Sequence, residues 1–132
     1  MDETLDLIQK FHGHLGPYVV LGYKMGLIAN EKLGKDPFCK NAIVYTGITP
    51  PISCIVDGIQ LSSGCTLGKG NIKVTNDKDP IAEFFNKSDE KLKIRLKDNI
   101  KQEIDTKVTE ENMISFSQNL WKKKDEDIFD IL

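Results

Sequence analysis

The chain has 132 residues, of which 39% are hydrophobic and 29% charged, and its formal net charge is −2. These values are typical of one soluble globular domain and exclude a strongly basic nucleic-acid-binding protein. Seventeen of the basic residues are lysines, and Arg95 is the one arginine. Because arginine is the residue that usually contacts bases and phosphates, this composition also argues against nucleic-acid binding. No apolar run approaches the ~20 residues of a membrane span, and the acidic N-terminus is unlike a secretory signal. We therefore expect a cytoplasmic protein that binds neither nucleic acid nor membranes.

Four segments show helical periodicity. The segment 4–11 carries apolar residues three and four positions apart. The segment 17–33 begins at a proline, which suits the first helical position, and stops before a glycine. Two prolines open a predicted third helix at 50–61, and a fourth helical pattern begins at Thr109.

Four β-rich runs are predicted strands, at 41–48, 71–75, 80–87 and 91–97. The last run alternates apolar with basic residues, as expected of a strand with one solvated face. The end of the chain, 122–132, is charged and then apolar, which predicts a frayed helix or a segment that docks on a partner. Helices and strands that come in blocks favour an α+β fold over a doubly wound parallel sheet.

We expect one domain over residues 1–132, with helices packed on a mainly antiparallel or mixed sheet. In the second predicted helix, Gly22, Gly26 and Asn30 recur at every fourth position, so another backbone could approach closely. In a membrane helix this spacing suggests dimerisation. In a soluble helix, packing within the domain explains it equally well.

Both histidines of the chain lie in the stretch FHGHLGP, residues 11–17. In extended backbone, side chains two positions apart point the same way, so His12 and His14 could face one metal ion. A His-x-His pair alone is better explained by two rings exposed to solvent.

The stretch SCIVDGIQ, residues 53–60, places Cys54 in the first turn of a predicted helix. A helix N-terminus favours an anion and lowers the pKa of a thiol, so Cys54 is a candidate thiolate. A buried, inert thiol explains this stretch equally well.

The stretch SGCTLGKGN, residues 63–71, surrounds Cys65 and Lys69 with three glycines. Such a loop can direct backbone N–H groups at an anion, with added charge from Lys69. Its spacing differs from that of a Walker loop, which excludes a P-loop nucleotide site. The alternative is a tight helix-to-strand connection that needs glycines for positive φ.

Two imidazoles and two thiols form the donor set of a zinc-type site. We therefore predict a transition metal, zinc in the simplest case, on His12, His14, Cys54 and Cys65. The wide separation of these residues along the chain is more typical of a catalytic or ligand-binding site than of a structural one. An enzyme with a Cys54 or Cys65 thiolate nucleophile and a histidine base is the alternative.

The segments FHGHLGPYVVLGYKMG and SCIVDGIQLSSGCTLGKGNI, in this order, resemble the E-subunit family of formylmethanofuran dehydrogenase. The resemblance implies an α+β core domain, a homodimer and one metal-binding cleft. It also implies archaeal one-carbon metabolism in methanogens and a dehydrogenase complex as a partner. Positions that match the family's motifs beyond the four metal ligands are implied to bind a small-molecule or anionic ligand: Asp57, Gln60, Lys69 and Asn71.

Gly16 stands where the family has the cysteine of its H-x-C-P motif, and Tyr18 replaces the glycine that follows. No cysteine follows Cys65, so we expect a stand-alone core domain without the C-terminal zinc ribbon of some members.

Three hypotheses result: a metal- or ligand-binding protein, a thiolate enzyme, or a subunit whose decayed site is kept for assembly. The retained histidines and cysteines favour the first.

Overall fold

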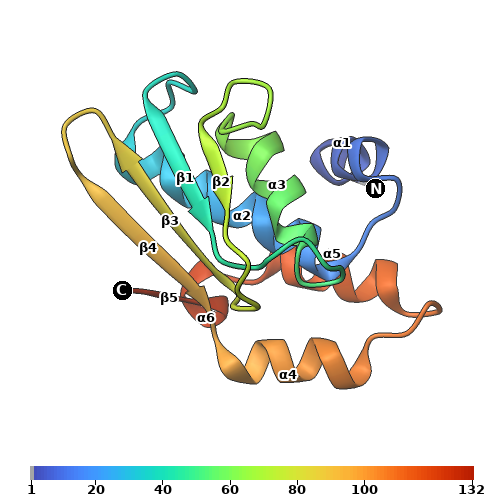
Figure 1. The fold of residues 1–132 in the computed structure, drawn as a ribbon. Coiled ribbons are helices and arrows are strands. Elements are labelled where there is room, and N and C mark those ends of the chain that lie inside the picture. Colours follow the sequence, from blue (N-terminus) through green and yellow to red (C-terminus); the bar gives the residue numbers. More distant parts are fainter. Residues whose placement is uncertain (1) are drawn as a thin grey trace.

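A five-stranded mixed sheet and six helices make up the computed structural model, which describes residues 2–132 (Figure 1). The strand order is β2-β1-β3-β4-β5, with β1 and β2 parallel and all other neighbours antiparallel. The predicted α+β fold with a mixed sheet is therefore confirmed. The elements are α1 (Glu3–His12), α2 (Pro17–Leu33), β1 (Lys40–Val44), α3 (Cys54–Ser63), β2 (Ile72–Val74), β3 (Ile81–Asn86), β4 (Lys91–Leu96), α4 (Asp98–Lys107), α5 (Met113–Lys122), α6 (Asp125–Ile128) and β5 (Phe129–Ile131).

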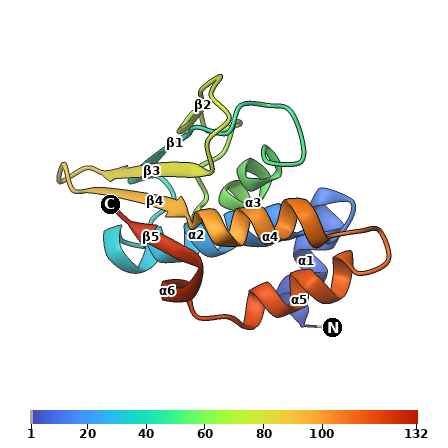
Figure 2. The ribbon, with the colours of Figure 1, turned by 90° about the horizontal axis from the view of Figure 1, so that it is seen from below.

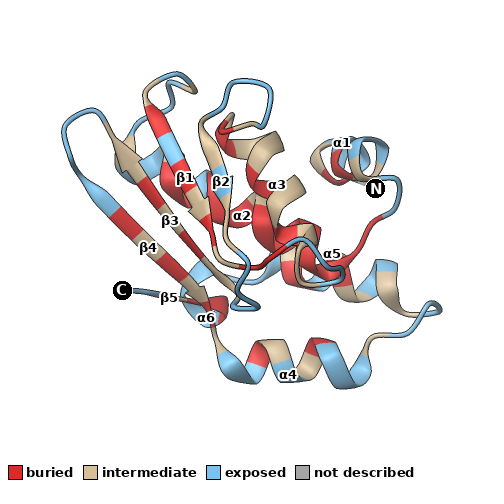
Figure 3. Cartoon of the chain, in the orientation of Figure 1, coloured by how far each residue is buried: buried red, intermediate tan, exposed pale blue. Residues whose placement is uncertain are grey.

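The helices lie on one side of the sheet, and α2 runs directly beneath it (Figure 2). Side chains alternate along β4, where Leu92, Ile94 and Leu96 are buried while Lys91 is exposed. The predicted alternation of this strand is thus confirmed, and the buried side chains form the core between the sheet and α2 (Figure 3).

Helix α2 is the centre of the fold and is buried along most of its length (Figure 3). A Cβ at Gly22 would collide with the backbone of Ile55 on α3, and a Cβ at Gly58 would collide with the backbone of α2. Close packing within the domain therefore explains the small residues of this helix. No helix among residues 2–132 is long and apolar enough to cross a membrane.

Three segments differ from the sequence expectations. No element is predicted over Asp98–Lys107, which forms α4 with only Ile100 and Ile104 buried. The C-terminal residues form the short helix α6 and then β5, which pairs with β4 as the edge strand, in place of a frayed helix. Its Phe129 is 3% exposed, so the apolar end of the chain completes its own sheet. The third helix begins at Cys54, because residues 50–53 form turns.

Candidate functional site

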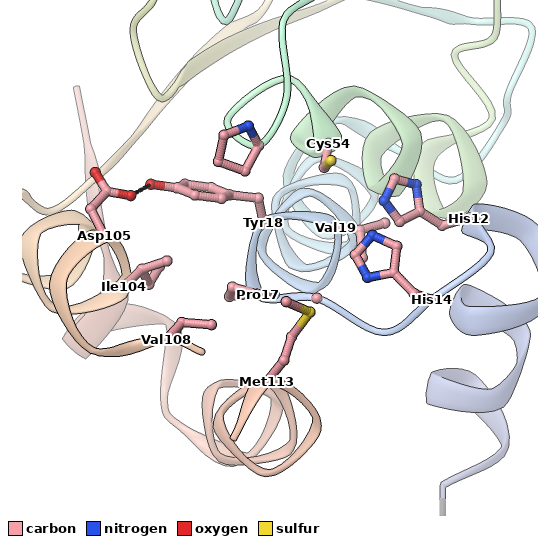
Figure 4. Close-up of a pocket in the computed structure, with 12 residues that line it drawn as sticks. His12, His14, Pro17, Tyr18, Val19, Cys54, Ile104, Asp105, Val108 and Met113 are labelled. Carbon is pink, nitrogen blue, oxygen red and sulfur yellow. Dashed lines mark hydrogen bonds between the residues drawn. The ribbon is translucent and has the colours of Figure 1, made fainter. Parts of the chain in front are cut away.

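A cavity of about 270 Å³ lies where the α1–α2 connection, the start of α3, the end of α4 and the start of α5 meet (Figure 4). His12, His14 and Cys54 line one end of it. Tyr18 and Asp105 lie at the other end, and the walls between them are largely apolar. The cavity is thus an apolar space with a nitrogen–sulfur cluster at one end.

Two helix ends bring the histidines together. His12 is the last residue of α1, which Gly13 terminates with a φ of 96°. Glycine adopts this left-handed conformation at no steric cost, so the chain can reverse at this point. The two imidazole centroids lie 4.8 Å apart. The rings face one cavity, although His12 is helical and not in the extended backbone expected from the sequence.

Asp57 on α3 orients the ring of His12. Its Oδ2 lies 2.6 Å from His12 Nδ1, and the His12 side chain is only 10% exposed. Since an ionised carboxylate can only accept, a neutral His12 carries its proton on Nδ1 and a lone pair on Nε2. Nε2 is buried and has no hydrogen-bond partner among residues 2–132. The site therefore holds an unpaired, pre-oriented imidazole nitrogen.

The environment of His14 favours its neutral form. Partial burial, followed by the neighbouring charge of His12, lowers the pKa of His14 below its ordinary value. A neutral ring keeps one nitrogen lone pair available, as metal binding requires.

Cys54 differs from the expectation of an activated thiolate. Burial, followed by the negative charge of Asp57, raises the pKa of the Cys54 thiol. Desolvation in an apolar cavity and a neighbouring carboxylate both disfavour the thiolate, which is opposite to the direction expected from the helix N-terminus. Among residues 2–132, no three His, Cys, Asp or Glu side chains are grouped so that they could hold a metal ion as they stand.

Cys65 lies apart from the histidines and Cys54. It is fully buried in the core, and it does not line the cavity. Burial raises the pKa of the Cys65 thiol as well. Three of the four predicted metal ligands thus line the same cavity, and Cys65 has the environment of a core thiol.

The glycine-rich loop after α3 is held by its own side chains rather than opened toward the cavity. Gln60 Oε1 accepts from the Leu67 N–H at 2.9 Å, and Asn71 Oδ1 accepts from the Thr66 N–H at 2.8 Å. Lys69 Nζ donates to Thr66 Oγ1. The loop is therefore supported by Gln60, Lys69 and Asn71. Of the four positions that were expected to bind a ligand because they match the family's motifs, Asp57 alone reaches the site through its contact with His12.

Three cavity residues are not predicted by the sequence. Tyr18 and Met113 belong to helical segments in which no site residue was predicted at their positions, and Asp105 lies on the unpredicted α4. Tyr18 donates its hydroxyl to Asp105 Oδ1 at 2.6 Å, and burial followed by this bond raises the pKa of Tyr18. No local pattern could reveal a contact between residues 87 positions apart.

Comparison of the sequence with known protein families identifies one whose model covers most of the chain. The model of the family described as "FmdE, Molybdenum formylmethanofuran dehydrogenase operon" matches residues 11–130. The chain belongs to the FmdE family. This membership confirms the resemblance inferred from the two long motifs.

Two proteins illustrate the relationship of this FmdE-family chain to others. An FmdE-like protein of the tungsten formylmethanofuran dehydrogenase type, from Syntrophus aciditrophicus, shares the fold, with a TM-score of 0.71 and 22% identity over 98% of this chain and 69% of that one. A probable S-adenosyl-L-methionine-binding protein from Archaeoglobus fulgidus is 39% identical over 66 residues. That match covers 48% of this chain, which spans only 18% of the length of the curated relative.

Proposed function

We propose that this FmdE-family protein binds a transition metal ion through His12, His14 and Cys54, beside an apolar cavity that receives a small organic ligand. The observation that carries the proposal is the buried, unpartnered Nε2 of His12. A buried polar atom without a partner costs stability, and such atoms in native proteins often serve a function.

The contact between Asp57 and His12 supports this assignment. Metal-binding histidines usually donate their second ring N–H to a carboxylate or carbonyl, which fixes the tautomer and makes the other nitrogen more basic. His12 shows this arrangement, with Asp57 on Nδ1 and no partner on Nε2 among residues 2–132. In this proposal, the carboxylate of Asp57 fixes the ring so that the Nε2 lone pair is available to an ion.

His14 and Cys54 would complete the set by side-chain rotation. The His14 ring is exposed and can turn without disturbing the core. Cys54 would lose its proton on binding, so affinity should rise with pH until the raised pKa of this thiol is reached. A bound ion of this kind supplies Lewis acidity to an oxygen or sulfur atom of the ligand.

The cavity sets the size of that ligand. Its volume of about 270 Å³ lies just below the ~300–1,000 Å³ usual for small-molecule sites. A compact organic molecule, or one part of a larger one, fits this space. The printed name of the Archaeoglobus fulgidus relative makes S-adenosyl-L-methionine a ligand to test. The family description names a formylmethanofuran dehydrogenase operon, which supports a role in one-carbon metabolism with a dehydrogenase complex as the partner. A cytoplasmic location is part of the same proposal.

The thiolate-enzyme alternative has less support. Burial raises the pKa of Cys54 and so disfavours its thiolate, and His12 Nε2 makes no hydrogen bond to it. A subunit kept only for assembly has no need of the Asp57–His12 arrangement.

Titration of reduced, tag-free, metal-free protein with Zn²⁺ against a chromophoric chelator tests the proposal. We expect wild type to bind, Asp57→Asn to bind about 10–100-fold more weakly, and His12→Ala and Cys54→Ser to lose most affinity. Cys39→Ser is the matched control, because Cys39 does not line the cavity. Equal affinity of wild type, His12→Ala and Cys54→Ser would show that the cavity is not a metal site.

A further inference from the structure

We infer that the thioether of Met113 is a further donor in this cluster, and that the resulting site selects a soft monovalent ion, Cu(I), over Zn²⁺. The inference rests on the proposed metal site and adds to it a ligand residue and the class of ion.

Met113 brings its sulfur to the histidine end of the cavity. It is the first residue of α5, and its side chain points inward from across the cavity (Figure 4). A Cβ built on Gly16 would lie 3.5 Å from His14 Nδ1 and 3.8 Å from Met113 Sδ. An imidazole nitrogen and a thioether sulfur therefore border the same point, beside a residue that has no side chain.

Gly16 is also where the family motif has a cysteine. The Sγ of a cysteine at this position would extend from a Cβ that lies beside His14 and Met113. In this chain Gly16 has no side chain, the His14 ring lies against the position, with its Cε1 3.0 Å from a Cβ built there, and the sulfur nearest to it is the Met113 thioether. A neutral sulfur thus stands close to the position from which an anionic one is missing.

A neutral thioether in place of an anionic thiolate changes which ion the site favours. Thiolate and thioether sulfur are soft ligands suited to Cu(I), whereas zinc sites are built from thiolate, imidazole and carboxylate. Loss of one negative charge also weakens the attraction for a doubly charged ion more than for a singly charged one. Both effects favour Cu(I) over Zn²⁺ at His12, His14, Cys54 and Met113.

A methionine that only fills an apolar wall can be replaced by leucine, which has a similar volume and is usually well tolerated in a core. A methionine that donates its sulfur cannot be replaced in this way. Met113→Leu therefore separates the two roles, because it preserves volume and removes the donor atom.

The experiment measures Cu(I) and Zn²⁺ affinity of wild type and Met113→Leu, anaerobically, against chromophoric chelators for each ion. We expect Met113→Leu to weaken Cu(I) binding on the order of tenfold and to leave Zn²⁺ binding within roughly twofold. Gly16→Cys restores the thiolate and should strengthen Zn²⁺ binding. X-ray absorption of Cu(I)-loaded selenomethionine protein should show selenium bonded to copper, which needs no variant.

The other possible results would each overturn a different part of the inference. Unchanged Cu(I) affinity in Met113→Leu, or copper without a selenium neighbour, would overturn the role of Met113 while the metal site stands. Equal losses for both ions would overturn the selectivity. If wild type binds neither ion, the proposed function itself fails.

Discussion

Replacement of Gly22 by alanine tests the closest contact in the fold, between α2 and α3. The added Cβ would fall on the carbonyl group and Cα of Ile55. Across the interface, Gly58 faces the backbone of Val19 and Tyr23 in the same way. Backbone atoms of a packed helix cannot rotate aside, so one helix must shift.

Two opposing terms set the size of the effect. Alanine stabilises a helix by about 1 kcal/mol relative to glycine, whereas overpacking of a well-packed core costs about 1–3 kcal/mol. Because the collision involves backbone, we expect overpacking to dominate, with a net loss of about 1–2 kcal/mol and a melting temperature lowered by roughly 3–10 °C. Gly22→Leu should cost more, toward about 3 kcal/mol.

Urea unfolding followed by circular dichroism measures the difference. Gly26→Ala is the comparison within α2, because the atom nearest to its Cβ would be the Ser62 hydroxyl, which can rotate, whereas the backbone N of Ser63 lies no closer than 3.0 Å. We expect a smaller loss there. Gly68→Ala should be nearly neutral, because nothing lies within 4 Å of its Cβ. If Gly22→Ala unfolds at the wild-type urea concentration or above it, close backbone packing does not limit this position.

Lys24→Met should lower the unfolding free energy by about 1–3 kcal/mol, because the buried ammonium donates to the carbonyls of Leu120, Trp121 and Lys123 at the end of α5. A wild-type urea midpoint would contradict this role. In metal-free protein, alkylation of Cys54 by iodoacetamide should increase with pH through a midpoint above the ordinary thiol value, since burial raises its pKa. A midpoint below pH 7 would instead support the thiolate enzyme. We also propose a homodimer, on the family resemblance, and expect light scattering to give twice the chain mass; a clean monomer at micromolar concentration would refute it.

Local sequence patterns were sufficient to predict an element wherever its hydrophobic periodicity or its flanking residues give a strong signal. The alternation in 91–97 and the proline and glycine that flank 17–33 predicted β4 and α2, because these signals act within a few residues. Helix α4 was missed because only Ile100 and Ile104 face the core, which leaves a weak pattern. The strand β5 was missed because its formation depends on an edge of β4 that no short segment reveals.

The sequence by itself determined the family, the α+β class and the prominence of His12, His14 and Cys54, since two long motifs and the local periodicities are readable in order. Only the tertiary structure decided which of these groups share a cavity. It buried Cys65 in the core, paired Asp57 with His12, and brought Met113 beside Gly16. The same burial raised the pKa of Cys54, although its helix position alone predicted the opposite direction. Desolvation depends on everything packed around a group, and those neighbours come from distant parts of the chain.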